Sequence, residues 1–353
     1  MDRSALEFLK KLAETPSPSG FEQPAARIIR ERMKGFADEV RTDVNGNVIG
    51  IVNGDAPLRV MLAGHCDEIG LMITHIDEKG YVYFAAIGGI DPAVLPGQMV
   101  EIHAEKRLVP GVIGRKAIHL MEPEERGKPS KIHEYWIDIG AKDKKDADKA
   151  VAVGDPITVS RRFLELRNNI VAGRGFDDRV GAWTVVETLR RMKKARPKVG
   201  VFAVTSVQEE LGLRGAKTAA FGITPHVGIA VDVGFASDYP EINKKLVGDV
   251  ALGRGPILHR GANINPVLAS LMEKTGRRKK IPFQIQAEPR ATGTDANVMQ
   301  MNGAGAATAL LSIPNRYMHT PVELVSLDDL DKAVELLVAT LGELKPGMDF
   351  TPR

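Results

Sequence analysis

The sequence has almost no cysteine and almost no excess of charge. Cys66 is the only cysteine among 353 residues, which excludes an internal disulfide framework and fits a reducing compartment. Lys and Arg number 48 against 45 Asp and Glu, so the net charge is only +3. Proteins that bind nucleic acid or membrane surfaces carry a concentrated basic footprint. We therefore expect neither nucleic acid nor a membrane as a partner.

Long apolar runs are also missing. No stretch approaches the roughly 20 consecutive apolar residues that cross a bilayer. The N-terminus, MDRSALEFLKKLAE, mixes charged with apolar residues and lacks the uninterrupted apolar core of a signal peptide. From these absences we expect a soluble cytoplasmic protein.

The composition that remains is that of an ordinary globular protein. Hydrophobic residues make up 43% and charged residues 26%, which is too apolar for a disordered chain. The length of 353 residues exceeds the roughly 250–300 residues at which a single hydrophobic core usually stops growing. Two structural units are therefore expected.

Helical and strand patterns alternate in both end regions of the chain. Apolar residues at helical spacing predict a first helix that ends before the loop 16–20 and a second helix at about 23–36. Asn45-Gly46 predicts a hairpin turn, and a short strand at 60–63 follows it. Further on, the patterns predict helices at 181–194, 266–275 and 327–344 and strands at 199–207, 227–233 and 307–312. This alternation favours an α/β fold with a mostly parallel sheet covered by helices on both faces.

Residues 69–159 have a different pattern. Short β-rich stretches are separated by Gly, Pro or charged turns, apart from a charged helical piece near 143–151. Such a pattern is typical of a small all-β module. We therefore expect residues 1–68 and 160–353 to form one α/β domain, into which 69–159 are inserted as a β-rich domain.

Acidic and imidazole side chains gather where the predicted strands of the α/β portion end. In open α/β sheets, ligands bind beyond the carboxyl ends of the strands. A mixture of His and carboxylates suits Zn²⁺ or Co²⁺, and it allows two ions that share a carboxylate to activate water for hydrolysis. The groups are His65 with Asp67, Asp177 with Asp178, Glu209 with Glu210, Asp232, and His319.

Several of these residues also have simpler explanations. In an extended chain His65 and Asp67 face one side, so Asp67 can orient the His65 ring. Cys66 faces the other side and is expected to be a small buried residue. Asp177 or Asp178 could instead cap the helix that follows them.

The remaining acidic residues leave similar alternatives open. Glu209 and Glu210 repel each other unless a cation or a proton lies between them. One could bind a metal while the other acts as general base to the attacking water, or both could be solvated. A lone charge in the apolar strand around Asp232 is costly, so Asp232 needs a metal, a cation or a capping role. His319 by itself could be an ordinary loop histidine.

A series of segments carries a family resemblance. They are TPSPSGFE (15–22), AGHCDEIGLMI (63–73), IGGIDP (87–92), IDIGA (137–141), GFDDRVGA (175–182), VQEELGLRGA (207–216), VDV (231–233), GTDAN (293–297) and IPNRYMHTPVE (313–323). In this order and spacing they resemble the tetrahedral aminopeptidases (TET, also called deblocking or glutamyl aminopeptidases). These are cytosolic di-metal exopeptidases of bacteria and archaea.

The resemblance implies a role for each matched position. His65 and Asp232 would hold one metal ion, Zn or Co, and Glu210 and His319 would hold the other. Asp177, the first Asp of FDDR, would bridge the two ions.

The same resemblance implies the chemistry and the assembly. Glu209 would be the general base for the attacking water, and Asp67 would orient His65. The substrates would be peptides with a free N-terminus. The inserted domain would be a dimerisation module, and the chain would be a homo-oligomer, commonly a tetrahedral dodecamer.

The preferred N-terminal residue is not implied. Loops at 234–236, 257–264 and 286–294 are expected to line the pocket. Arg260 and Arg290 would favour acidic N-terminal residues if they point into it, and are otherwise surface residues. His119 could reach the site if the inserted domain folds over the cleft.

Other functions compete with this interpretation. A related di-metal carboxypeptidase or deacylase would use similar ligands, and a non-catalytic oligomeric scaffold would be expected to have lost one of the proposed site residues. A glucanase needs two facing carboxyl groups roughly 5–9.5 Å apart. Glu209 and Glu210, adjacent in an extended segment, would face opposite ways, so this function is not favoured.

Overall fold

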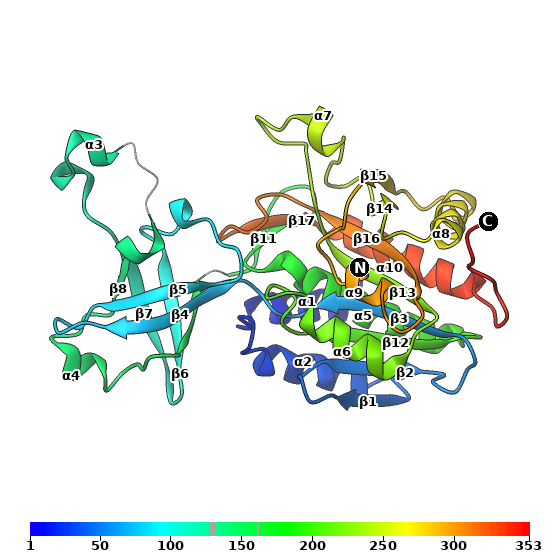
Figure 1. The fold of residues 1–353 in the computed structure, drawn as a ribbon, viewed down its shortest axis with the longest axis horizontal. Helices are drawn as coiled ribbons and strands as arrows, with labels where there is room; N and C mark the ends of the chain where they lie inside the picture. The colour runs from blue at the N-terminus through cyan, green and yellow to red at the C-terminus, as the bar shows by residue number, and fades with distance from the viewer. Residues whose placement is uncertain (127–130, 161) are drawn as a thin grey trace.

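The computed structural model describes residues 1–126, 131–160 and 162–353. A β-barrel lies at one end of the long axis, and a large sheet with helices on both faces forms the rest of the molecule (Figure 1). In the described ranges, no helix combines the length and the apolar character needed to cross a membrane.

The larger sheet is mixed, with a parallel centre. In the described part of the chain its strands are β1 (Glu39–Thr42), β2 (Val48–Val52), β3 (Arg59–His65), β12 (Gly200–Ser206), β13 (Val227–Phe235), β14 (Ile257–Gly261), β15 (Gln284–Glu288) and β16 (Ala307–Asn315). Their spatial order is β1-β2-β12-β3-β13-β16-β14-β15. β12, β3, β13 and β16 run parallel to one another. β2 is antiparallel to β12, and β14 is antiparallel to β16, so the prediction of a parallel sheet is confirmed for the centre and the direction reverses toward both edges.

The central strands are apolar on both sides because helices cover both faces of the sheet. In β3, Val60 and Leu62 belong to one hydrophobic core, and Met61 and Ala63 belong to the other. The first core contains residues of α1 (Arg3–Glu14), α2 (Gln23–Lys34), α5 (Phe176–Ala195), α8 (Pro266–Lys279) and α10 (Leu327–Glu343). The second contains residues of α6 (Arg214–Ile223) and α9 (Ala296–Gln300).

A close approach between α5 and β3 positions the start of α5. A Cβ atom at Gly64 would lie 2.5 Å from the backbone carbon of Gly181, closer than packed atoms can be. Because Gly64 has no side chain, α5 can pack directly against β3 at this position. As a result, the first turn of α5 lies beside the carboxyl end of β3.

The barrel has its own core. Its strands are β4 (Gly70–Ile76), β5 (Val82–Ile87), β6 (Met99–Ala104), β7 (Arg107–Gly114), β8 (Trp136–Asp138) and β9 (Pro156–Val159), closed in the order β4-β5-β8-β7-β6-β9. Leu71, Ile73, Val100 and Ile102 are among the buried residues inside it. Short helices connect the strands: η1 (Pro92–Val94), η2 (Ile118–Leu120), α3 (Pro123–Arg126), η3 (Ile132–Glu134) and α4 (Lys144–Ala147). The predicted fold class, an α/β sheet with an inserted β-barrel, is confirmed.

A small antiparallel sheet lies next to the start of α5. It consists of β10 (Leu164–Glu165), β11 (Ile170–Gly173) and β17 (Glu323–Ser326). β11 leads into α5, and β17 leads into α10, so this sheet fixes the segment between β16 and α10. The short helix α7 (Lys244–Val247) follows β13.

The prediction that residues 257–264 and 286–294 form loops is partly wrong. The first contains β14, and the second begins inside β15. β15 is the edge strand of the sheet and alternates between half-buried and exposed residues, while β14 lies next to it. An edge strand of this kind lacks the continuous apolar run that marked the central strands.

Candidate active site

The predicted site residues come together at the carboxyl ends of the parallel strands. All of them except Asp67 and Asp178 line a pocket of about 480 Å³ at this edge of the sheet. His65 is the last residue of β3, Asp232 lies in β13, Glu209 and Glu210 follow β12, His319 follows β16, and Asp177 lies in the first turn of α5.

Asp177 lies between two imidazole rings. Its Oδ1 is 3.1 Å from Nε2 of His65, and its Oδ2 is 3.3 Å from Nε2 of His319. Each ring also faces a second carboxylate. Asp232 Oδ1 is 4.0 Å from Nε2 of His65, and Glu210 Oε2 is 3.7 Å from Nε2 of His319. The arrangement is two His–carboxylate pairs with one carboxylate between them.

Asp67 connects the end of β3 to the segment after β12. Its Oδ1 accepts the backbone N–H of Glu209 at 3.1 Å, and its Oδ2 accepts that of Glu210 at 3.2 Å. The Ser19 hydroxyl also donates to Oδ2, at 2.6 Å. Nδ1 of His65 lies 3.1 Å from the Asp67 backbone oxygen and 3.4 Å from Oδ1. Asp67 therefore contacts both the ring of His65 and the backbone of the two glutamates.

Asp177 and Asp178 have different surroundings. Asp178 Oδ1 accepts the backbone N–H of Gly181 at 3.0 Å, which is a helix-capping bond. Its Oδ2 accepts the backbone N–H of His65 at 3.0 Å. Asp178 lies close enough to His65 and Asp232 to form a ligand-like group, but both of its oxygens already accept backbone bonds. We conclude that Asp178 caps the helix, whereas Asp177 faces the pocket.

Glu323, which the sequence reasoning did not single out, contacts the backbone of both Asp177 and His319. Its side chain accepts the backbone N–H of Asp177 at 2.8 Å and that of His319 at 3.2 Å. His319 has a φ of 60°, in the left-handed region that is strained for residues other than glycine. The bond to Glu323 helps to hold His319 in this conformation. Only the pairing of β17 with β11 brings Glu323 here, so its distance in sequence from Asp177 concealed it.

The inserted module touches the site through Gly88 and Gly89, which follow β5. A Cβ atom at Gly88 would lie 3.3 Å from Oε2 of Glu210, and one at Gly89 would lie 3.3 Å from Nδ1 of His319. The IGGIDP motif was the available signal for this contact. His119, which was considered for such a role, is exposed and does not line the pocket.

Three further residues near the site, Ser206, Asp295 and Cys66, are buried. The Ser206 hydroxyl donates to Oδ2 of Asp295 at 2.5 Å, and burial raises the pKa of Asp295 to about 6. Cys66 is fully buried, as predicted, and this burial raises the pKa of its thiol.

Three of the carboxyl groups that face the pocket, those of Glu209, Glu210 and Asp232, have raised pKa values. Burial raises the pKa of Glu209 to about 10, and the nearby charge of Asp232 adds to this effect. Burial, together with the charge of Asp177, raises the pKa of Glu210 to about 7. The pKa of Asp232 is also raised by burial. A set of buried carboxyl groups with these properties calls for a positive charge among them.

Asp177 and the two imidazoles behave in the opposite way. Burial would raise the pKa of Asp177, but hydrogen bonds from His319 and His65 lower it below the ordinary value. The hydrogen bond to Asp177 raises the pKa of His319 to about 9. Burial would lower the pKa of His65, but the charge of Glu209 and the contact with Asp177 raise it instead. Asp177 is thus the anionic centre of the cluster.

The donor set fits divalent cations. Imidazole nitrogens and carboxylate oxygens are the ligands that Zn²⁺ and Co²⁺ accept, and the ligand atoms of His65, Asp177 and Glu210 lie within 4.8 Å of one another. Oε1 of Glu210 is buried and has no hydrogen-bond partner among the described residues. A buried, unpartnered carboxylate oxygen facing such a cluster is what a bound cation would satisfy.

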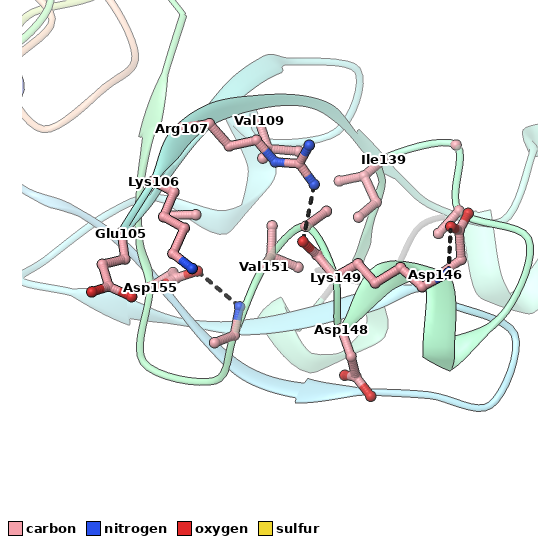
Figure 2. A pocket seen from close by; sticks show the side chains of 15 residues that line it. Glu105, Lys106, Arg107, Val109, Ile139, Asp146, Asp148, Lys149, Val151 and Asp155 are labelled. Carbon is pink, nitrogen blue, oxygen red and sulfur yellow. Dashed lines mark hydrogen bonds and ion pairs between the residues drawn. The ribbon is translucent and has the colours of Figure 1, made fainter.

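A larger hollow lies in the barrel module, away from these residues. Figure 2 shows this hollow, of about 830 Å³, between β6, β7 and the segment after α4. Side chains of both signs, including Arg107, Lys149 and Asp155, line it, and Arg107 donates to the backbone oxygen of Lys149 at 3.0 Å. None of the predicted site residues lines this hollow.

Solved structures with this fold define the class. A TET aminopeptidase from a marine sediment archaeon of the Thaumarchaeota superposes with a TM-score of 0.92 at 35% identity, covering 97% of this chain and 98% of that one. The TET1 peptidase of Pyrococcus horikoshii, described as assembling into a tetrahedron or a large octahedral shell, gives a TM-score of 0.87 at 33% identity, covering 96% and 100%. The fold is that of a TET aminopeptidase.

Sequence comparison identifies the family. The model of the M42 glutamyl aminopeptidases matches residues 46–336. The lysyl aminopeptidase of Pyrococcus furiosus is 41% identical over 349 residues, which is 98% of this chain and 99% of that protein. The chain belongs to the M42 glutamyl aminopeptidase family, and it is a peptide hydrolase of the aminopeptidase class.

Proposed function

We propose that this aminopeptidase holds two divalent ions, Zn²⁺ or Co²⁺, on either side of Asp177. His65 and Asp232 would hold one ion, and Glu210 and His319 would hold the other. The observation that carries this proposal is the position of Asp177, whose two oxygens lie 3.1 and 3.3 Å from the two imidazoles. A carboxylate that presents one oxygen to each side is suited to bridge paired ions.

The ions would polarise the scissile carbonyl and lower the pKa of water at the site. Glu209 is the general base in this proposal. Its carboxylate borders the pocket 3.7 Å from His65, and the charge of the ions would lower the pKa that burial raises. It would then take a proton from the attacking water and pass it to the leaving amine. Asp67, which accepts the backbone N–H of Glu209, is a positioning residue for Glu209 and for His65.

The substrate is proposed to be a peptide with a free N-terminus. The pocket of about 480 Å³ is lined by residues of β13, β14, β15 and β16, and its size suits the end of a peptide. The names of the related proteins point to different N-terminal residues, glutamyl for the family and lysyl for the relative from Pyrococcus furiosus. They leave the preference of this chain open.

We also propose a homo-oligomer built through the inserted barrel, which would act as a dimerisation domain spanning residues 69–159. On its outer surface Met99 pairs with Val112 across β6 and β7, and both are exposed, as is Leu108. Exposed apolar side chains that cluster on one strand pair are typical of an interface. A TET1 structure described as a dodecamer, and the tetrahedral assembly described for the TET1 peptidase, support a dodecamer. A cytoplasmic location belongs to the same proposal, since a reducing compartment suits the buried thiol of Cys66.

An end-labelled peptide digest tests this function. The same peptide is offered with a free and with an acetylated N-terminus, before and after treatment with a strong chelator. We expect single residues to be released from the free N-terminus only, with activity lost on chelation and restored by Co²⁺ or Zn²⁺. Cleavage of the acetylated peptide at the same rate, or undiminished activity after chelation, would contradict the proposal.

A further inference from the structure

One wall of the pocket is formed by β14 and by the edge strand β15. The two strands run parallel, with His259 beside Gln286 and Gly261 beside Glu288. Successive side chains of a strand point to opposite faces, so Gln286 and Glu288 lie on the same face of β15. Both line the pocket, together with His259.

Glu288 brings an unneutralised carboxylate to this wall. It is half-buried, and its side chain makes no hydrogen bond or ion pair with any residue in the described ranges. No Lys or Arg is among the described residues that line the pocket. The four other carboxylates of the pocket contact the imidazoles of the proposed metal centre or lie within it, whereas Glu288 belongs to the edge strand β15.

The arginines that could have neutralised it point elsewhere. Arg260 follows His259 in β14 and therefore faces the other side of the sheet. There its guanidinium donates to both oxygens of Glu273 in α8, at 2.8 and 2.6 Å. Arg290 is exposed and does not line the pocket. The expectation that these two residues select acidic substrates is therefore not supported.

The other polar groups of this wall are neutral and can accept hydrogen bonds. Nε2 of His259 lies 2.9 Å from the Ser312 hydroxyl, while its Nδ1 is buried and has no partner in the described chain. His259 is only 8% exposed, and burial lowers its pKa to about 4, so the ring carries no charge at neutral pH. The side-chain nitrogen of Gln286 donates to the Val247 backbone at 2.7 Å, which leaves the amide oxygen available as an acceptor.

Apolar side chains also line the pocket. They include Leu213, Phe235 and Met318. A long amphipathic side chain packs its methylene stem against such a surface and carries its charge to a polar end. Lys and Arg have this form, while an acidic side chain would be repelled by Glu288.

We propose that Glu288 is the specificity residue of this enzyme and that the pocket selects a cationic side chain, Lys or Arg, at the N-terminal position of the peptide. The inference rests on the proposed function, because it takes the pocket to be the place of the N-terminal residue. Glu288 would pair with the ammonium or guanidinium group, while the amide oxygen of Gln286 offers a further acceptor.

Matched substrates isolate the charge. Lysine and norleucine anilides share the same methylene stem and the same free α-amine and differ in the terminal ammonium group. For the wild-type enzyme we expect kcat/KM to be about 10- to 100-fold higher for the lysine anilide, as a charged hydrogen bond in a half-buried site provides. In Glu288→Gln this advantage should be lost while norleucine cleavage stays within about twofold. Glu39→Gln, at an exposed position of β1, is the matched control and should keep the wild-type ratio.

Charge reversal gives a second readout. In Glu288→Lys we expect glutamate anilide to be cleaved faster than lysine anilide. Equal cleavage of lysine and norleucine by the wild type would overturn the proposal. So would an equal fall on both substrates in Glu288→Gln, because that result would assign Glu288 to the α-amine or to the fold. Loss of all anilide cleavage by the metal-loaded wild type would instead count against the proposed function, so the two failures are distinguishable.

Discussion

The carboxylate of Asp67 accepts the backbone N–H of Glu209 at 3.1 Å, so the residue proposed to orient His65 also holds the proposed general base. The two residues follow the neighbouring parallel strands β3 and β12, which pair up to His65 and Ser206. Glu209 follows three residues later, where the strand pairing no longer fixes the backbone. At this point the hydrogen bond to Asp67 holds the backbone of Glu209 in place. The position of the base therefore depends on a residue that does not itself line the pocket.

Replacing Glu209 by Gln should separate metal binding from turnover. The variant keeps the size of the side chain but cannot take a proton, so we expect kcat to fall by about 100- to 10,000-fold. Metal stoichiometry, measured by elemental analysis of the purified protein, should remain that of the wild type. Glu210→Gln is the contrasting variant and should lose metal as well as activity. Full activity of Glu209→Gln would show that another group is the base.

Replacing Asp67 by Asn should disturb the site without touching substrate. One side-chain oxygen is replaced by an N–H₂ group, which faces a backbone N–H of Glu209 or Glu210 instead of accepting it. We expect metal affinity or kcat/KM to fall by about 10- to 100-fold, as for other partners of ligand residues. Competition with a chromogenic chelator measures the affinity.

Ser19→Ala is the milder companion of this variant, since it removes the hydroxyl that donates to Asp67 at 2.6 Å and leaves the backbone bonds in place. Its effect should be smaller than that of Asp67→Asn. If the two variants were equally impaired, the backbone bonds would not be the basis of the effect.

Gly88 should tolerate no side chain. It has a φ of 74°, and a Cβ atom there would lie 2.8 Å from Cγ2 of Ile69 and 3.3 Å from Oε2 of Glu210. We expect Gly88→Ala to lower kcat/KM by about 10-fold or more, because small displacements of site residues are costly. Gly97, with a φ of 82° and open space around it, is the matched control. Gly97→Ala carries the same backbone strain, so a similar loss of activity there would contradict a specific contact with Glu210.

The Glu68 carboxylate should stabilise the fold. It is fully buried between Arg174 Nε, at 2.8 Å, and Arg179, and it accepts the Ser17 backbone N–H at 3.0 Å. Glu68→Gln leaves two buried guanidinium groups without a counter-charge, and we expect it to lower the free energy of unfolding by roughly 3–5 kcal/mol. Urea unfolding at neutral pH measures the difference.

The pH dependence of this difference provides the control. Burial would raise the pKa of Glu68, but the charges of Arg174 and Arg179 lower it below the ordinary value. A depressed carboxyl pKa stabilises the folded state above the unfolded pKa of about 4.5, and this stabilisation is lost as the pH falls through the folded pKa. The gap between wild type and Glu68→Gln should therefore be constant from about pH 6 to 8 and shrink below pH 4.5. A gap that is unchanged in acid would mean that packing, rather than charge, is its source.

Much of the architecture could be predicted from the chain. Asn45-Gly46 predicted the turn between β1 and β2, and the apolar stretches around Val201, Ile229 and Ala309 predicted the central strands. These signals are local, because a strand buried on both faces must be apolar throughout, and a tight turn needs residues that adopt its backbone angles. The edge strand β15 escaped notice because half of its residues are exposed.

The residue types of the site could also be predicted, but not their division of labour. The predicted site residues follow predicted strands, which indicated the carboxyl ends of a sheet, and their side chains indicated a metal. They are His65, Asp177, Glu209, Glu210, Asp232 and His319. The chemistry of the residues alone left Asp177 and Asp178 equivalent, and only the family resemblance singled out Asp177. The structure separates them, since one faces the pocket between two imidazoles and the other accepts backbone bonds from Gly181 and His65.

Long-range pairing decided the rest. Glu323 reaches Asp177 and His319 because β17 pairs with β11, and Gly88 meets Glu210 because the barrel is held against the sheet. Arg260 faces away from the pocket, whereas Glu288 lines it. Alternate residues of a strand face opposite sides of the sheet, and the register between β14 and β15 determines which residues share a side. The sequence by itself determines the chemistry that is available, whereas strand order and register, which arise from contacts between distant segments, determine which of these groups meet.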